Sequence, residues 1–170
     1  MLFESEKSKF ETLVKAYSPE LYRYAYWRCR DRFVAEDLVQ ETFTRAWQAW
    51  EKLRDEKAAK SWLYTILRNE HARLYEGKRI EVDEAQELDE IVDTSNPGAY
   101  ESFEMSDMLK ALPPGYREPL VLQVLGGFSC AEIASMMNIS EGAVMTRLTR
   151  ARLALRKMPG PVTARRMKAR

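Results

Sequence analysis

Residues 128–157 constrain the fold more than any other stretch, because their sequence, FSCAEIASMMNISEGAVMTRLTRARLALRK, predicts two helices joined by a tight corner. We expect the first helix over about 130–137, with Ser129 as its N-cap and Glu132 three residues further on. The corner falls at 138–140, and the second helix is long. A short helix, a corner and a longer helix are the pattern of a helix-turn-helix.

The helix after the corner has two unlike faces. Ser140 is its expected N-cap, and Glu141 lies in the first turn, where the helix dipole favours an acid. An apolar stripe is formed by Val144, Leu148, Ala151 and Leu155. The opposite side carries Gly142, Thr146, Arg150 and Lys157, and Arg147 flanks the stripe. This face suits a DNA major groove, since small residues permit close approach and Arg reaches phosphates or guanine edges. A helical hairpin with a solvated basic face is the alternative.

Charge is distributed unevenly along the 170 residues, although the net charge is only +1. Residues 80–109 hold ten acids and no base, whereas residues 142–170 hold nine bases and no acid. A strongly basic end is the electrostatic footprint of a nucleic-acid binder. Runs of β-branched residues are few, which argues against a β-rich fold. We therefore expect an all-α fold with two small helical domains, the second a helix-turn-helix domain.

The N-terminal half predicts amphipathic helices. Residues 4–17 form the first, and Ser18–Pro19 is expected to start a new helix, with Ser as its cap. After a break at 31–34, residues 35–50 form a strong helix. Its buried stripe comprises Val39, Phe43, Ala46, Trp47 and Trp50.

An acidic face lies on the other side of helix 35–50. Asp37 and Glu41 are four residues apart, and Gln40 lies beside them. This face is either a docking surface for a basic partner or a solvated face partly neutralised by Arg45.

Residues 51–60 are expected to turn the chain before a helix that Ser61 can cap. The apolar face of that helix comprises Trp62, Leu63, Ile66, Leu67 and Leu74, while Tyr64 and Arg68 are expected to point elsewhere. Basic residues interleaved with aromatics suit single-stranded nucleic acid, because bases stack on aromatic rings and cations follow phosphates. A core role is the alternative, especially for Trp62.

No catalytic or metal-binding arrangement can be recognised. The sole histidine, His71, has no His or Cys nearby in the sequence. Cys29 and Cys130 are far apart in the sequence, so we expect both cysteines to be small core residues. Their spacing gives no disulfide framework, which fits a reducing cytoplasm. We expect no enzyme activity, cofactor or metal. An enzyme such as a nuclease is a further alternative, but it would need clustered carboxylates or a metal set, which the sequence does not supply. No apolar run approaches the roughly 18 residues of a membrane span, and no signal peptide is recognised.

The acidic stretch 80–104 has a turn signal at Asn96–Gly98 and is expected to be a flexible linker. Helical patterning then resumes, and after an interruption at 113–115 a further helix runs to Gly126–Gly127. Residues 159–170 are expected to be a basic tail. One hypothesis is that the acidic linker folds onto the basic residues 147–170, and a solvated linker is the alternative.

Four motifs in this order resemble the extracytoplasmic-function sigma factors, the minimal two-domain kind of the sigma-70 family. They are AEDLVQETFTRAW at 35–47, SWLYTILRN at 61–69, LPPGYREPLVL at 112–122 and SEGAVMTRLTRARLALRK at 140–157. The resemblance implies a region 2 domain over 1–80, a linker over 81–104, a region 4 domain over 105–158 and a tail over 159–170.

The resemblance also implies partners and roles. The first domain would hold the clamp helices of the largest subunit of core RNA polymerase through Asp37, Gln40 and Glu41. It would open the minus-ten element of promoter DNA with the 51–60 turn and the helix after it, using Lys60, Trp62, Arg68 and Asn69. The second domain would lie under the flap of the second-largest subunit and read the minus-thirty-five element. Its residues would be Ser140, Glu141, Gly142, Thr146, Arg147 and Arg150. A controlling anti-sigma protein is expected as a further partner.

Two positions depart from the family pattern. Met145 stands where Lys is common, and Arg73 stands where Asp is expected. A DNA-binding regulator whose first domain senses a ligand or partner is the main alternative, and the acidic face at 37–41 has a clear role only in a sigma factor.

Overall fold

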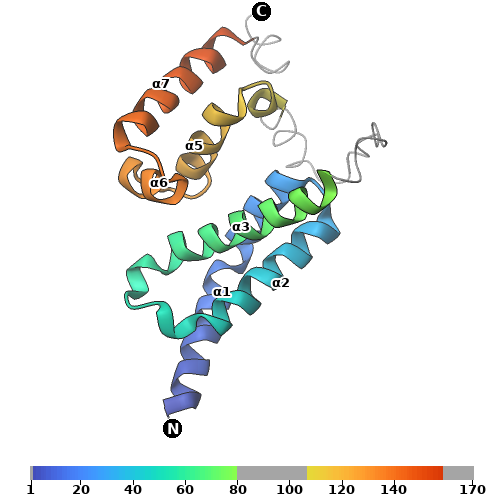
Figure 1. Ribbon diagram of the computed structural model, residues 1–170, viewed down its shortest axis with the longest axis vertical. Coiled ribbons are helices and arrows are strands. Elements are labelled where there is room, and N and C mark those ends of the chain that lie inside the picture. Colours follow the sequence, from blue (N-terminus) through green and yellow to red (C-terminus); the bar gives the residue numbers. More distant parts are fainter. Residues whose placement is uncertain (1, 80–106, 159–170) are drawn as a thin grey trace, which may run out of the picture. The chain divides into compact units, whose positions relative to one another are not determined.

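The computed structural model describes residues 2–79 and 107–158, and every regular element within these ranges is helical, as predicted (Figure 1). The chain divides into two compact units, Met1–Leu88 and Asp89–Arg170, and each is described by itself. The acidic stretch 80–104 and the tail 159–170 lie outside the described residues. The hypothesis that the acidic linker folds onto residues 147–170 therefore stays a prediction. None of the described helices is both long and apolar enough to cross a bilayer.

The first element is one continuous helix, α1 (Leu2–Cys29), so the prediction of a new helix at Ser18–Pro19 is wrong. Pro19 lies inside α1 and faces solvent. An interior proline costs about 3 kcal/mol through a lost hydrogen bond and a steric clash. Leu21 and Tyr24, just beyond it, are fully buried. Each such side chain stabilises the fold by about 1.5–3 kcal/mol, so packing outweighs the local signal.

The second helix, α2 (Arg32–Gln48), begins earlier than the predicted residue 35, because Asp31 caps it. The Asp31 carboxylate accepts hydrogen bonds from the backbone N–H groups of Phe33 at 2.8 Å and Val34 at 3.1 Å. The predicted stripe is partly right, since Val39 and Ala46 are buried, but Leu38 and Thr42 are buried as well.

Two short 3-10 turns, η1 (Trp50–Lys52) and η2 (Glu56–Ala58), connect α2 to the third helix, α3 (Ala59–Arg79). The Asp55 carboxylate accepts from the backbone N–H of Lys57 at 3.0 Å and caps η2. Ser61 is not the N-cap that was predicted, because its hydroxyl lies inside α3 and donates to the carbonyl of Ala58 at 3.1 Å. The helix α3 therefore begins directly after the turn η2, at Ala59, and not at a serine cap.

Tyr64 belongs to the core of the first unit, so the prediction that it points elsewhere is wrong. Its ring lies 4.8 Å from that of Tyr24, and its hydroxyl donates to Glu20 Oε1 at 3.2 Å. Burial, followed by the nearby Glu20 carboxylate, raises the pKa of the Tyr64 phenol well above its usual value. The Tyr64 ring thus packs in the core as a Phe ring would, while its hydroxyl forms a hydrogen bond with Glu20.

The second unit contains α5 (Pro114–Val124), α6 (Cys130–Met137) and α7 (Glu141–Lys157). Pro114 occupies the first turn of α5, so this helix starts inside the expected interruption. A β-carbon on Gly126 would lie 2.5 Å from the Phe128 ring, and Gly127 has a φ of +68°, so the chain needs glycine where α5 turns toward α6.

The corner between α6 and α7 follows the prediction closely. Ser129 and Glu132 form a complete capping box at the start of α6. Asn138 ends α6 in the left-handed conformation, at φ 55°, which Asn tolerates better than most residues. Ile133, Val144 and Leu148 are buried between these helices and α5. Cys29 and Cys130 are free thiols and are half-buried rather than fully buried.

Candidate nucleic-acid and partner interfaces

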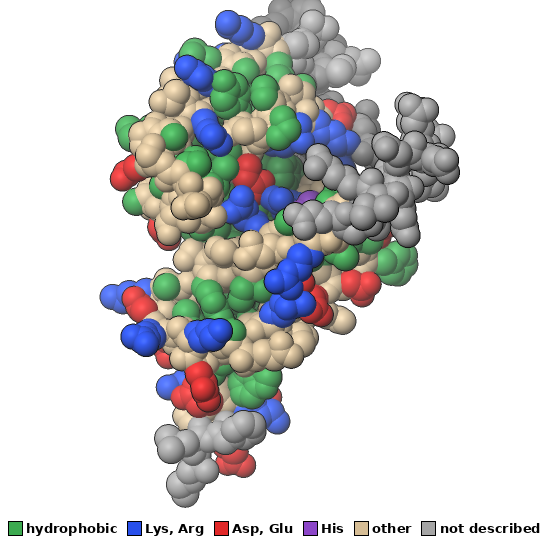
Figure 2. All heavy atoms as spheres, viewed as in Figure 1, with side chains coloured by type: hydrophobic (Ala, Val, Ile, Leu, Met, Phe, Trp, Pro, Cys, Tyr) green, Lys and Arg blue, Asp and Glu red, His purple; other side chains and the backbone are tan. Residues whose placement is uncertain are grey.

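The acidic face of α2 is a real surface feature. Asp37, Gln40 and Glu41 are all exposed and lie together on the outer side of the helix. Phe33 lies one turn before Asp37 and is 75% exposed. The sequence pattern predicted a break between helices at 31–34, so Phe33 was not among the predicted contact residues. Acidic and basic side chains are interspersed on the visible face of the first unit (Figure 2).

Glu41 is linked to the helix α3 through one arginine. Arg45 Nε lies 3.0 Å from Glu41 Oε1 and 2.6 Å from Glu70 Oε1. The Glu70 side chain is 9% exposed, and Arg73 Nη1 lies 3.3 Å from the same oxygen. Partial neutralisation by Arg45 was one of the two alternatives for this face, and no sequence pattern indicated the pairing of Arg45 with Glu70.

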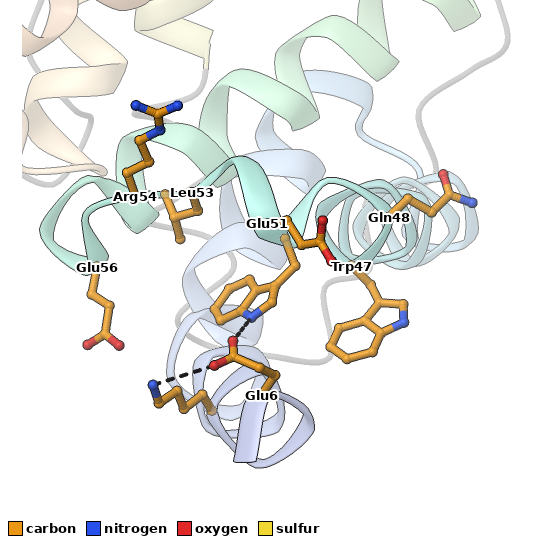
Figure 3. A pocket seen from close by; sticks show the side chains of 9 residues that line it. Glu6, Trp47, Gln48, Glu51, Leu53, Arg54 and Glu56 are labelled. Carbon is orange, nitrogen blue, oxygen red and sulfur yellow. Dashed lines mark hydrogen bonds and ion pairs between the residues drawn. The ribbon is translucent and has the colours of Figure 1, made fainter. Parts of the chain in front are cut away.

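Aromatic rings gather where α1 meets the end of α2 and the turn η1. The rings of Phe10 and Trp50 are 5.3 Å apart, and those of Trp50 and Trp62 are 6.4 Å apart. The Trp50 indole donates to Glu6 Oε2 at 2.6 Å (Figure 3). A cavity of about 600 Å³ beside it is lined by nine residues, among them Glu6, Lys9, Trp47, Trp50, Leu53 and Arg54.

The four residues predicted to contact the minus-ten element do not form one stripe. Trp62 and Asn69 are two turns apart, so they lie on one side of α3. Lys60 instead lies 3.4 Å from Glu20 of α1. Arg68 is half-buried, and Asn69 is exposed. Trp62 is half-buried against Trp50, so it has a packing role in addition to any DNA contact.

The predicted groove face of α7 is exposed along its outer side. Glu141, Gly142, Thr146 and Arg150 are exposed, whereas Arg147 is half-buried. Apart from its chain neighbours and the backbone of α7, no atom lies within 4 Å of a β-carbon built on Gly142, so no other part of the described residues covers this point of the helix.

Two of the predicted groove residues are fixed by neighbours. Ser140 Oγ accepts from the backbone N–H of Ala143 at 3.1 Å, so this side chain caps α7. Arg150 Nη1 donates to the Tyr116 hydroxyl of α5 at 3.4 Å. Tyr116 was missed, because no local pattern relates it to α7.

Among residues 2–79 and 107–158, no group of three His, Cys, Asp or Glu side chains is arranged to hold a metal ion. The two units together define a class: a helical protein with an exposed acidic face on one module and a helix-turn-helix on the other.

Comparison with known proteins gives the family. The family model for sigma-70 region 2 matches residues 13–80, and that for sigma-70 region 4 matches residues 102–155. The chain therefore belongs to the sigma-70 family, and its relatives place it among the extracytoplasmic-function RNA polymerase sigma factors.

Two curated relatives and one solved structure illustrate the likeness. SigL of Mycobacterium tuberculosis is 30% identical over 158 residues, which cover 89% of each chain. BldN of Streptomyces coelicolor is 34% identical over 154 residues, which cover 86% of this chain and 58% of BldN. The sigma factor RpoE of Bartonella quintana, solved with the anti-sigma factor NepR, has a TM-score of 0.75 and 26% identity, covering 88% of this chain and 95% of RpoE. Family membership favours the sigma factor over the alternative of a ligand-sensing regulator.

Proposed function

We propose that this sigma factor binds core RNA polymerase through the outer face of α2 and directs it to promoters as a non-enzymatic subunit in the cytoplasm. The observation that carries the proposal is the exposure of Asp37, Gln40 and Glu41 together on α2, inside the region 2 match. Carboxylates on a rigid helix suit a basic partner surface, and electrostatic complementarity speeds association and selects the partner. The clamp helices of the largest polymerase subunit are the proposed partner.

An aromatic anchor would complete this face. Phe33 is 75% exposed and lies beside Asp37. Aromatic side chains often dominate binding energy when a partner desolvates them. Phe33 would therefore add apolar contact to the charge contact of Asp37 and Glu41.

The minus-ten element would be opened by α3 and the turn before it. Asn69 is exposed on the same side of α3 as Trp62, whose ring packs on Trp50. Aromatic rings stack with unpaired bases, and Lys60 and Arg68 supply cations for phosphates. We assign Trp62 and Asn69 to the bases, and Lys60 and Arg68 to the backbone.

The minus-thirty-five element would be read by α7 in the major groove, with the unit held under the flap of the second-largest subunit. The exposed Gly142 allows close approach, and the exposed Arg150 can reach a guanine edge or a phosphate. Two DNA contacts in one chain give an avidity above that of either contact alone.

An anti-sigma protein is the proposed regulator. RpoE, which resembles this chain over most of its length, was solved with the anti-sigma factor NepR. A partner that covers the face of α2 would block the binding of polymerase.

A titration of core polymerase with the labelled protein tests the proposal. Reversing two charges, in Asp37→Lys with Glu41→Lys, should weaken the affinity at least about tenfold, or about 1.4 kcal/mol. Glu11→Lys is the control, since the Glu11 side chain is 60% exposed on α1, outside the proposed face. Equal affinity for the charge-reversed protein and the control would refute the polymerase-binding role of this face.

A further inference from the structure

Glu70 is the one acidic residue that is buried among the described residues, with 7% of its surface exposed. A buried carboxylate is stable only when cations or hydrogen-bond donors compensate it. Arg45 of α2 and Arg73 of α3 both do so, at 2.6 Å and 3.3 Å. Arg73 is one of the two residues that depart from the family pattern, and it gives Glu70 a second cation.

The same Arg45 Nε is also the partner of Glu41, at 3.0 Å. One arginine is thus shared by two carboxylates: its Nε–H donates a hydrogen bond to Glu41, and the same nitrogen lies within ion-pair distance of Glu70. Without Arg45, the buried carboxylate of Glu70 would be less well compensated, which costs free energy. The Glu41 side chain is 48% exposed, so water can solvate its carboxylate instead.

We propose that Glu70 is a positioning residue for polymerase binding, because it draws Arg45 away from Glu41 and keeps the Glu41 carboxylate available to a basic partner. Without the Glu70 charge, Arg45 would pair with Glu41 alone, one turn away on α2, where Glu and Arg attract each other. The acidic face would then lose part of its charge, although none of its own residues had changed. This inference depends on the proposed function, because it assumes that Glu41 contacts polymerase.

Glu70→Gln tests the inference, since it removes the charge and keeps the shape. Its Kd for core polymerase, measured by titration in the absence of DNA, should rise about threefold, the size expected for one partly exposed ion pair. Adding Arg45→Gln to Glu70→Gln should return the Kd to the wild-type value or below, because no cation then remains to neutralise Glu41. The double variant holds no buried charge at this site, and a thermal melt of each variant checks that it is folded.

The control is Arg73→Gln. Arg73 contacts Glu70 but has no ion pair with Glu41, so the Kd should stay at the wild-type value. A general loss of structure around Glu70 would raise the Kd in Glu70→Gln and in the double variant alike, and this result would overturn the inference.

Glu41→Gln separates the two proposals. If Glu41→Gln raises the Kd and Glu70→Gln has no further effect in that background, both proposals are supported. If Glu41→Gln raises the Kd while Glu70→Gln alone leaves it unchanged, only the role of Glu70 is lost. If Glu41→Gln itself leaves the Kd unchanged, Glu41 does not contact polymerase, and both proposals fail at this residue.

Discussion

Glu6 accepts a hydrogen bond of 2.6 Å from the indole of Trp50, which lies 44 positions further along the chain. The bond joins the first turns of α1 to the 3-10 turn η1, and the same indole packs on Trp62. The start of the chain thus supports the turn that precedes the proposed minus-ten residues.

Glu6→Ala should destabilise the first unit by about 1 kcal/mol, the net contribution of one hydrogen bond. Glu6→Gln is the matched variant, since its amide oxygen can still accept from Trp50, and it should lose less. All four tryptophans lie in residues 27–62, so tryptophan fluorescence during urea unfolding reports on this unit. An equal loss of stability in both variants would mean that Glu6 stabilises the unit by some means other than accepting the hydrogen bond from Trp50.

The stability of the first unit should fall in alkali because of Tyr64. Burial raises the pKa of this phenol, so folding favours the protonated form. Its contribution is fully present below the unfolded pKa of about 10 and is lost as the pH rises toward the folded pKa, by at most about 1.4 kcal/mol per pH unit. Tyr64→Phe should flatten this decline in urea unfolding between pH 8 and 11.

Tyr26→Phe is the control for that experiment, because the Tyr26 side chain is 47% exposed. It should keep the alkaline decline of the wild type. A decline in Tyr64→Phe as steep as that in Tyr26→Phe would exclude Tyr64 as its cause.

Gly142→Ala should separate folding from DNA binding. The methyl group meets no atom within 4 Å, and Ala favours helix, so the stability should be unchanged or raised by up to about 1 kcal/mol. Affinity for a promoter fragment, measured by fluorescence anisotropy, should fall about tenfold, or about 1.4 kcal/mol, because the methyl group holds the backbone of α7 away from the groove. Val124→Ala on α5, where Val124 is 63% exposed, is the control outside the groove face. Unchanged DNA affinity in Gly142→Ala would place the groove contact elsewhere on α7.

Arg150→Ala should weaken binding to the upstream promoter element by about 1–3 kcal/mol if Arg150 reads a base. An equal loss on unrelated DNA would instead identify a phosphate contact. Tyr116→Phe removes the hydroxyl that Arg150 contacts but keeps the guanidinium, so it should cost much less. DNA binding by Arg150→Ala at wild-type strength would remove this residue from the proposed interface.

The sequence predicted the second unit better than the first, for a physical reason. Ser129, Glu132 and Ser140 act on backbone groups within three residues, so the pattern of residue types is enough to place the starts of α6 and α7. At Pro19 the local signal was equally clear, but the burial of Leu21 and Tyr24 just beyond it decided the outcome. At Ser61 the turn η2 leads directly into α3, so the helix begins before the predicted cap.

The candidate site shows the same limit. Asp37, Gln40 and Glu41 could be placed on one face from helical spacing alone. The pairing of Arg45 with Glu70 depends on how α2 packs on α3, and no periodicity relates the two. Residues that position a site from another helix are therefore visible only in the folded structure.

Transcription from promoter-bearing DNA fragments, with bacterial core polymerase and with or without this protein, tests the central claim most directly. We expect promoter-specific transcripts only when the protein is present, and we expect them to vanish when Asp37 and Glu41 are both changed to Lys. Binding to the DNA fragments without polymerase, together with no new transcripts in its presence, would contradict the assignment of this chain as a promoter-directing subunit.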